Sequence, residues 1–340
     1  MKLLRTLMVI ALGSLATAEV ENHVCIPTGY SRICILEDIN YQLNGTTTHV
    51  FPEGQKHIRI RETDDWKSKH SNIPHFDTGL YLLLGNPTVL EARNVGIETL
   101  DIPPTLRHGN FKDNSIRTSW VTVNEEDNVE PSLVYLNLAN NWISQLPNGI
   151  QRLGNLEILI LDSNSIETIP PNTLTKLTKL KIVSISFNSL HRFSTELFPT
   201  SLTYLDLFLN NLDHDLEYDK LHFPAMETLN LERNRLKQID ASALIMAMPQ
   251  LKTVRISGNS FSEDQLRSAV EVFRRRNITF QSEVDEESCF YDEDTVEGVC
   301  LQLEEEPMGV PQAIVFTVMV VMVAVIFVLV TRWVLRQMNK

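Results

Sequence analysis

The side chains best able to carry chemistry in this chain are four cysteines, which form two local pairs: Cys25 with Cys34, and Cys289 with Cys300. In an oxidising compartment, short-range pairs of this kind form disulfides by default, although other connectivities remain open. A zinc site would need closer spacing and histidine partners, which the cysteines lack. We therefore expect two disulfides and no metal site.

Catalytic constellations are missing from the sequence. Its nine histidines are scattered, and it holds no glycine-rich phosphate loop, nucleophile elbow, paired metal-binding histidines or Cys–His arrangement. The sequence therefore predicts a binding protein that is not an enzyme and needs no cofactor.

The elements that would position a binding surface are repeats. The stretch "SLVYLNLANNWISQLPNG" at 132–149 follows the pattern LxxLxLxxNxL, and five further copies follow it. This is the leucine-rich-repeat signature at its usual period. In each copy one asparagine is expected to satisfy buried backbone groups at the turn after a short strand. These asparagines are Asn141, Asn164, Asn188, Asn210, Asn234 and Asn259.

The pattern predicts an α/β repeat solenoid, a leucine-rich-repeat horseshoe with short parallel strands on its concave face. Upstream of residue 133 the repeat frame is irregular. The end caps would be a cysteine-closed N-terminal segment and a C-terminal helix, in which Ser262 and Gln265 form a capping box. The expected order is a signal peptide at 1–18, an N-terminal cap at 19–55, degenerate repeats at 56–132, six regular repeats at 133–261, a capping helix at 262–276, an acidic stalk at 277–309, a transmembrane helix at 310–331 and a cytoplasmic tail at 332–340.

The two chain ends carry the localisation signals. The first 18 residues combine a basic start, a short apolar run and Ala16-Thr17-Ala18, which is typical of a secretory signal peptide; an uncleaved anchor helix is the weaker reading. From Ala313 to Val330 only Thr317 is polar, and basic residues follow. This favours a single span with an extracellular ectodomain at the plasma membrane over a lipid-anchor signal.

The surface is acidic, with a net charge of −13 for the chain. Such a surface repels phosphate backbones, so nucleic acid is excluded as a partner. Two sequons, at Asn44 and Asn277, are candidate N-glycosylation sites.

Binding is predicted on the concave face, where residues flanking the buried leucines point outward. The middle repeats place apolar residues there although polar ones would suffice, which is typical of an interaction surface. The alternative is that these residues serve only strand propensity. The candidate ligand-binding residues are Tyr135, Ile158, Ile160, Ile182, Phe187, Tyr204, Phe208 and Leu209.

Residues 20–280, including "LVYLNLANNWISQLPNGIQRLGNLEILILDSN", resemble the mosquito leucine-rich-repeat immune proteins. The resemblance implies a secreted protein whose coiled coils support dimers that carry complement-like thioester proteins. This chain departs from that pattern because it has no heptads after the repeats and no spare cysteine. It looks like a transmembrane subclass, for which transfer of thioester-protein binding is doubtful.

We therefore expect a surface protein of innate immune recognition that binds extracellular protein or microbial ligands. A cytoplasmic tail of this size holds no signalling domain, so a signal would need a co-receptor. The alternative is a cell-adhesion or developmental protein of the same architecture.

Overall fold

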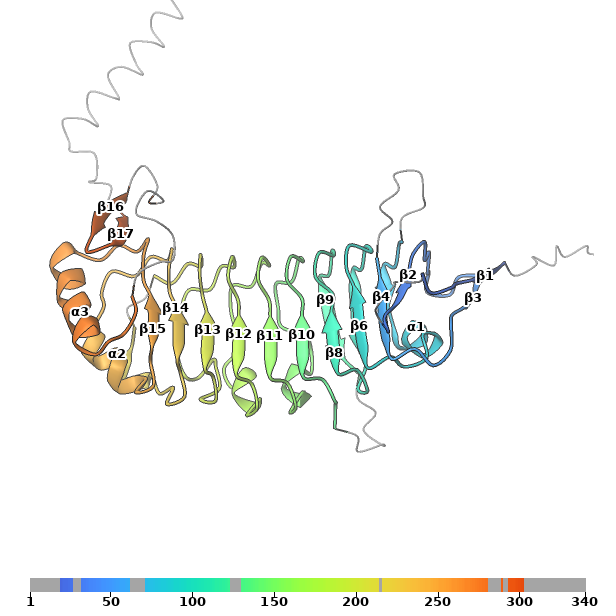
Figure 1. Cartoon of the computed structure of the whole chain (residues 1–340), viewed down its shortest axis with the longest axis horizontal. Helices are drawn as coiled ribbons and strands as arrows, with labels where there is room; N and C mark the ends of the chain where they lie inside the picture. Colours follow the sequence, from blue (N-terminus) through green and yellow to red (C-terminus); the bar gives the residue numbers. More distant parts are fainter. Residues whose placement is uncertain are drawn as a thin grey trace, which may run out of the picture.

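The computed structural model describes residues 19–26, 32–61, 71–122, 130–213, 216–280, 289 and 293–302. Its main element is a 10-stranded parallel sheet that runs along an elongated solenoid, one strand per coil (Figure 1). The strands lie side by side in chain order. They are β2 (Cys34–Leu36), β4 (His57–Ile60), β6 (Val89–Ala92), β8 (His108–Asn110), β10 (Tyr135–Asn137), β11 (Ile158–Ile160), β12 (Ile182–Ser184), β13 (Tyr204–Asp206), β14 (Thr228–Asn230) and β15 (Thr253–Arg255).

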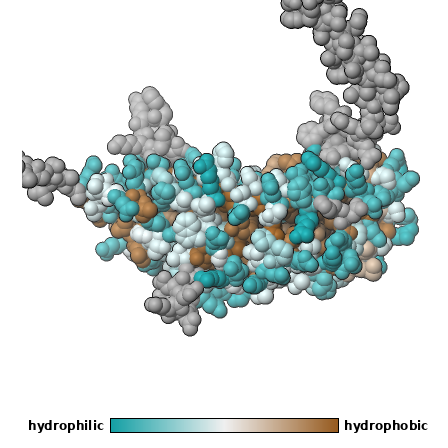
Figure 2. All heavy atoms as spheres, turned by 180° about the vertical axis from the view of Figure 1, so that it is seen from behind, coloured by the Kyte–Doolittle hydropathy of each residue, from teal (hydrophilic) through white to brown (hydrophobic). Residues whose placement is uncertain are grey.

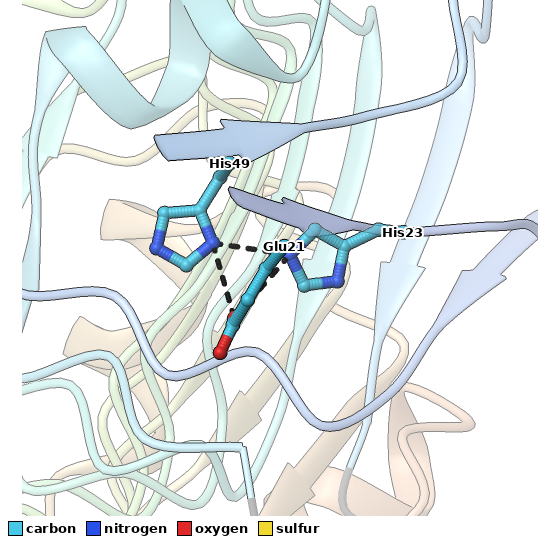
Figure 3. Close-up of side chains that lie close together, drawn as sticks. All are labelled: Glu21, His23 and His49. Atoms are coloured by element: carbon cyan, nitrogen blue, oxygen red, sulfur yellow. Dashed lines mark hydrogen bonds and ion pairs between the residues drawn. The ribbon is translucent and has the colours of Figure 1, made fainter. Parts of the chain in front are cut away.

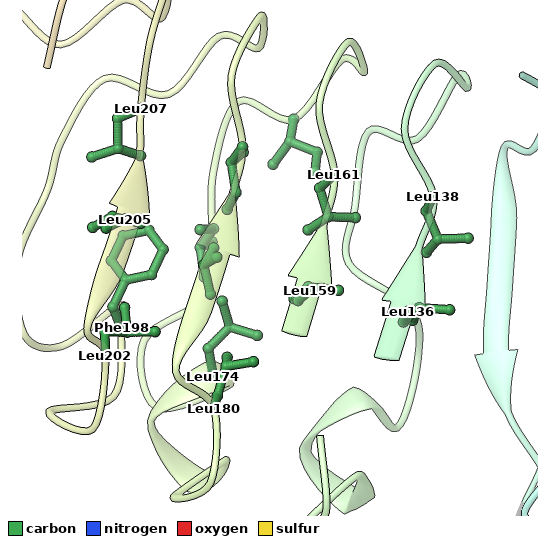
Figure 4. Close-up of a cluster of buried hydrophobic side chains, with 14 of the residues drawn as sticks. Leu136, Leu138, Leu159, Leu161, Leu174, Leu180, Phe198, Leu202, Leu205 and Leu207 are labelled. Atoms are coloured by element: carbon green, nitrogen blue, oxygen red, sulfur yellow. The ribbon is translucent and has the colours of Figure 1, made fainter. Parts of the chain in front are cut away.

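Repeated leucines fill the interior of this solenoid. In the regular coils the strand's central aliphatic residue and the one two residues later point inward, as Leu136, Leu138, Leu159 and Leu161 do (Figure 4). All four are fully buried, and equivalent residues of the next coil cover them. One coil alone could not bury these side chains, so the coils are stable only as a stack.

The repeat asparagines join adjacent coils. Asn234 is representative: its Oδ1 accepts from the backbone N–H of Leu212 at 3.1 Å, and its Nδ2 donates to the carbonyl of Leu207 at 2.9 Å, both in the preceding coil. The same Nδ2 also donates to the carbonyls of Leu231 and Glu232 in its own coil. The other five asparagines of the regular repeats make the corresponding bonds to the coil before them.

The returns between strands are short, and they correct the predicted α/β class. Most consist of turns and 3₁₀ helices, namely η1 (Ile150–Arg152), η2 (Leu174–Lys176) and η3 (Tyr218–Lys220). The α-helices in returns are only α1 (Thr78–Leu83) and α2 (Ala241–Ala247) among the described residues. Three early returns instead form a second parallel sheet from β5 (His75–Phe76), β7 (Thr99–Ile102) and β9 (Thr118–Val121). The fold is therefore a parallel β-solenoid consistent with a leucine-rich-repeat horseshoe.

The region before residue 133, whose sequence pattern is degenerate, contains a coil built like the regular ones. Asn114 holds the asparagine position of the coil that contains β8: its Oδ1 accepts from the backbone N–H of Val95 at 3.0 Å. In that coil Gly109 replaces the strand's central leucine, and the Phe111 ring fills the vacated space. A Cβ at Gly109 would lie 2.8 Å from Phe111 Cε2.

Segments that carry disulfides cover both ends of the main sheet. At the N-terminal end, β1 (Val20–Asn22) pairs with β3 (Thr48–Val50), and Cys25 bonds to Cys34, as predicted. At the other end, α3 (Glu263–Arg275) begins at the Ser262 cap and packs against the last coil.

The acidic stalk expected at 277–309 is partly folded. β16 (Glu293–Val296) and β17 (Val299–Gln302) form an antiparallel hairpin, and the second predicted disulfide, Cys289–Cys300, joins it. Glu297 and Gly298 at its turn both have positive φ, 57° and 79°, as a tight two-residue hairpin requires. Val296 and Val299 are buried, so the hairpin belongs to the folded body.

The transmembrane helix in the predicted architecture is the second point that the structure corrects. Among the described residues, no helix has the length and apolar character needed to cross a membrane. The expected signal peptide, the span at 310–331 and the tail at 332–340 lie outside the described residues.

Candidate ligand-binding face

The side of the main sheet that points away from the core, called the strand face below, aligns the predicted binding residues in columns. Cα register pairs Tyr135 with Ile158, Ile158 with Ile182 and Ile182 with Tyr204. Ile160 lies in the next column, between Asn137 and Ser184. The side chains of Ile158, Ile160, Ile182 and Tyr204 are only half-buried, because neighbouring coils cover their flanks and leave their tips open.

Three of the predicted residues, Phe187, Phe208 and Leu209, form what we call the apolar patch. The rings of Phe187 and Phe208 contact each other with centroids 5.2 Å apart and planes inclined by 59°. The backbone N–H of Phe187 donates to the carbonyl of Phe208, which fixes the two coils in register. Phe187 is 49% exposed and Leu209 40% exposed, so the patch faces solvent.

The backbone at Phe187 and Leu209 is in the left-handed region, with φ of 53° and 49°. The residue just before the repeat asparagine has positive φ in every coil of this series, and elsewhere that position holds small, polar or charged residues. They are Asp113, Asn140, Ser163, Arg233 and Gly258. A bulky residue with positive φ is an outlier that costs of order 1–3 kcal/mol, and such strain gathers at functional sites.

Carboxylates border the apolar patch on the strand face. Tyr204 donates its hydroxyl hydrogen to Asp206 Oδ2 at 3.2 Å, and the Phe208 backbone N–H donates to Asp206 Oδ1 at 2.9 Å. Asp162 Oδ1 accepts from Ser184 Oγ at 2.6 Å and from the Ser186 backbone N–H at 2.8 Å.

The pKa values of Tyr204 and Asp206 are both shifted by burial. Burial, together with the carboxylate of Asp206, raises the pKa of the Tyr204 phenol to about 12. Burial also raises the pKa of Asp206, which the negative charge of Asp162 pushes in the same direction. An ionised carboxylate is therefore held here at an energetic cost.

An asparagine at the position of Asp206 could make the same backbone hydrogen bond without the cost of burying a charge. In the coil of β10, Asn137 occupies the same column, accepts from the backbone N–H two residues on at 2.9 Å and contacts the hydroxyl of Tyr135 at 3.2 Å. Asn230 makes the corresponding backbone bond at 3.0 Å. The scaffold thus accepts asparagine on both sides of Asp206, which suggests that the charge itself is used.

A second feature of the strand face was missed by sequence reasoning. Over the early coils there is a hollow of about 420 Å³, and Tyr135 belongs to this hollow rather than to the apolar patch. It is lined by His57, Val89, Leu90, Glu91, His108, Asn110 and Tyr135. Period-two alternation in "HIRI" and "VLEA" could have placed His57 and Glu91 on the outer face, but the repeat frame was obscured there.

The floor of this hollow is an ion-pair network. Glu91 accepts from Arg59 Nε at 2.9 Å and from Arg59 Nη2 at 3.0 Å, and lies 2.8 Å from His57 Nε2. Burial alone would raise the pKa of Glu91, but the bonds from Arg59 and His57 outweigh it and lower that pKa. For His108, burial lowers the pKa, and the electrostatic effects of the nearby Arg107 and His57 act in the same direction. The network pairs Glu91 with cations, whereas Asp206 at the other end feels the charge of Asp162 as well as that of Arg255.

Other surfaces show that isolated apolar exposure is common in this protein. Seen from the side opposite to Figure 1, hydrophobic residues emerge at several places between hydrophilic ones (Figure 2). Scattered residues of this kind need no explanation. The apolar patch differs because the rings of Phe187 and Phe208 contact each other and because Phe187 and Leu209 have a strained backbone. The sequons at Asn44 and Asn277 are both exposed, which leaves them accessible to glycans.

The comparisons with known proteins agree with the repeat architecture. Two models described as leucine rich repeat match residues 132–153 and 154–212. The chain is 27% identical to osteomodulin of Bos taurus over 183 residues, which cover 46% of this chain and 42% of that protein. It is 30% identical to Toll-like receptor 2 of Capra hircus over 190 residues, covering 54% of this chain and 22% of the receptor. The chain thus spans less than half the length of these relatives.

Among solved structures, the LRIM1/APL1C complex matches with a TM-score of 0.38 and 17% identity, over 94% of this chain and 78% of that chain. A likeness at this level carries no conclusion about function. The chain therefore contains leucine-rich repeats over at least residues 132–212. Two disulfides are typical of an extracellular or secreted protein, because such bonds persist in oxidising compartments.

Proposed function

We propose that this protein acts in innate immune recognition outside the cell and binds a protein or microbial ligand through the apolar patch. One observation carries the proposal: Phe187 and Leu209 occupy a left-handed backbone position that polar or charged residues or glycine fill in the other coils, and both apolar side chains are exposed. Strained, exposed apolar residues on adjacent coils are better explained by a ligand than by the fold.

The charge of the surface around the apolar patch limits the chemical class of ligand that would fit. Asp162 and Asp206 lie beside the patch, and the chain as a whole carries a net charge of −13. A partner that fits would pack an apolar or aromatic side chain against the exposed side of the two rings and place a lysine or arginine against the carboxylates. Aromatic anchors that are flanked by charge are frequent hot spots of protein interfaces.

The immune assignment draws on the likeness to Toll-like receptor 2 and on the resemblance to mosquito immune repeat proteins. The alternative is a role in adhesion or development that uses the same binding face. The likeness to osteomodulin is the observation that favours this alternative. Expression in blood cells with induction by infection would favour the immune role. Expression at neural or muscle contacts would favour the alternative.

The test uses the purified full-length chain, immobilised and exposed to body fluid of the source organism and to microbial surfaces. Bound material is compared between the wild type and the double variant Phe187→Asn/Leu209→Asn. Both substitutions place asparagine where Asn140 already stands in another coil, so folding is preserved. The matched control is Ser163→Asn at the same position of a neighbouring coil.

We expect the double variant to lose the captured ligand while the control retains it. A hot spot of this type is worth about 2 kcal/mol or more, which is a loss of roughly 30-fold in affinity. Equal capture by wild type and by a correctly folded double variant would refute the use of the patch.

A further inference from the structure

The N-terminal cap brings together three side chains that are far apart in the sequence and could share one ion. β1 and β3 pair in parallel, and Cα register sets Glu21 opposite His49. His23, two residues after Glu21, points to the same side, and its backbone N–H donates to the carbonyl of Val50 at 2.9 Å. Figure 3 shows the carboxylate and the two imidazoles converging.

We propose that Glu21, His23 and His49 bind a divalent transition-metal ion of the zinc class. The donor atoms are Glu21 Oε2, His23 Nε2 and His49 Nδ1, which all lie within 4.8 Å of one another. The two imidazole nitrogens are 3.0 Å apart, and Glu21 Oε2 lies 3.5 Å from His49 Nδ1 and 3.9 Å from His23 Nε2.

These distances suit a single tetrahedral ion. Bonds of about 2.0–2.2 Å would place neighbouring ligand atoms roughly 3.3–3.5 Å apart and two bound imidazole centroids roughly 5.2 Å apart. The observed centroid separation is 5.3 Å. With the nitrogens 3.0 Å apart the two rings point straight at each other, so the ion would part the nitrogens by a few tenths of an ångström and each ring would turn to aim its lone pair at the ion, a rotation that the broad χ2 torsion of histidine allows.

Without an ion the cluster is under-satisfied. A single proton between the two imidazoles serves those nitrogens, but it leaves Glu21 Oε2 buried without a hydrogen bond among the described residues. The side chains of His23 and His49 are only 8% and 3% exposed, so water does not readily supply the missing donor. A cation would satisfy all three groups at once.

The surroundings hold the ligands and admit an ion. The ring of His23 lies against Phe51, with centroids 4.6 Å apart, and Tyr41 lies 5.8 Å from His49. A hollow of about 440 Å³ opens beside Glu21 and His23, and Glu37 and Asp38 also line it, so its potential attracts cations. Two imidazoles and one carboxylate select zinc or its neighbours over calcium and magnesium, and the remaining coordination position would take water.

The test is calorimetric titration of Zn²⁺ into the full-length chain, purified without a histidine tag and stripped with a chelator. We expect one equivalent to bind and to raise the Tm. We also expect Co²⁺ to bind there with the absorption spectrum of a tetrahedral site. Glu21→Gln keeps the shape of the side chain and should weaken Zn²⁺ binding at least about tenfold, and His23→Gln should abolish it.

The matched control is His191→Gln, which removes an exposed histidine 3.7 Å from a single carboxylate, that of Asp213. It should bind Zn²⁺ as the wild type does. The side chains of His23 and His49 are both buried, so circular dichroism of His23→Gln and His49→Gln must first show that they fold, and Glu21→Gln at the partly exposed carboxylate carries the test if they do not. Absence of Zn²⁺ binding, or equal affinity in wild type and Glu21→Gln, would overturn the proposal and leave a pair of histidines that share a proton.

Discussion

The ring of Phe187 packs against the ring of Phe208 from the next coil, 5.2 Å away, while the backbone of Phe187 itself is left-handed, with φ of 53°. The first relationship stabilises the coil and the second destabilises it. The two effects can be separated, because substitutions that remove the ring may either keep or relieve the backbone strain.

Phe187→Asn is expected to be more stable than Phe187→Ala by about 1 kcal/mol. Both variants lose the ring, but asparagine tolerates a left-handed backbone that costs other residues about 1–2 kcal/mol. Urea unfolding of the two variants measures the difference. At Ile182, where φ is not positive, the same Asn-against-Ala comparison should give no such advantage. Equal stability of the two Phe187 variants would contradict the strain assigned to this position.

Asn234→Ala should destabilise the solenoid by about 3 kcal/mol or more, because each buried backbone group left without a partner costs about 1–3 kcal/mol. The side chain is 1% exposed and bonds to Leu212, Leu207, Leu231 and Glu232. Chemical denaturation followed by circular dichroism measures the loss. The exposed Gln238→Ala in the same coil serves as the control. A loss below about 1 kcal/mol would show that water replaces the amide.

Asp206→Asn should raise stability at neutral pH. Burial raises the pKa of Asp206, so the folded state binds its proton more tightly than the unfolded state does. The ionised carboxylate therefore lowers stability as pH rises from the ordinary pKa of 3.8 to the raised value, and the loss persists above it. The advantage of the variant should be present at pH 7 and vanish below the ordinary pKa.

Unfolding midpoints of wild type and Asp206→Asn, measured across that pH range, check the sign of the stability difference. Asp240→Asn, at an exposed carboxylate at the N-terminus of α2, is the comparison. A wild type more stable than Asp206→Asn at pH 7 would show that the hydrogen bonds of the charged form outweigh its burial. If the variant is more stable but loses its ligand, then the charge serves binding.

Gly109→Ala should destabilise the early coils by about 1–3 kcal/mol through overpacking. The new Cβ would lie 2.8 Å from Phe111 Cε2 and 3.1 Å from Leu106 Cδ2, and Phe111 is fully buried against Phe76. The double variant Gly109→Ala/Phe111→Leu should recover most of the loss, since leucine restores the usual volume of the repeat. Thermal unfolding of both variants decides the point; no rescue by leucine would place the strain in the backbone.

The regular coils could be predicted from sequence because each one repeats the same interior chemistry. Leu205, Leu207 and Asn210 recur with the same spacing as Leu136, Leu138 and Asn141, and the structure aligns their strands. The coil of Asn114 escaped detection for a physical reason. It exchanges volume between two positions, glycine at one and phenylalanine at the other, so the interior is conserved while the leucine pattern is not.

The two ends were harder to predict because pairing between distant segments shapes them. His23 and His49 meet only through the pairing of β1 with β3, three-residue strands with no strong pattern of their own. The hairpin of β16 and β17 did carry a local signal, Glu297-Gly298 between β-branched residues, but the surrounding acids favoured an extended stalk. Likewise, the strain at Phe187 and Leu209 depends on backbone angles that composition does not reveal.

Both disulfides lie where the main sheet would otherwise end in open hydrogen-bonding groups. Next to Cys25, the backbone N–H of Ile26 donates to the carbonyl of Ile35 on β2, and the N–H of Gly258 after β15 donates to the carbonyl of Cys300. A parallel solenoid whose edge strands are uncovered exposes unpaired backbone groups, and further copies can pair with these groups end to end and form a fibre. At the C-terminal edge Thr279 pairs with β15 independently of Cys289–Cys300, so reducing conditions would expose the N-terminal edge, which the Cys25–Cys34 bond secures, before the leucine interior unfolds.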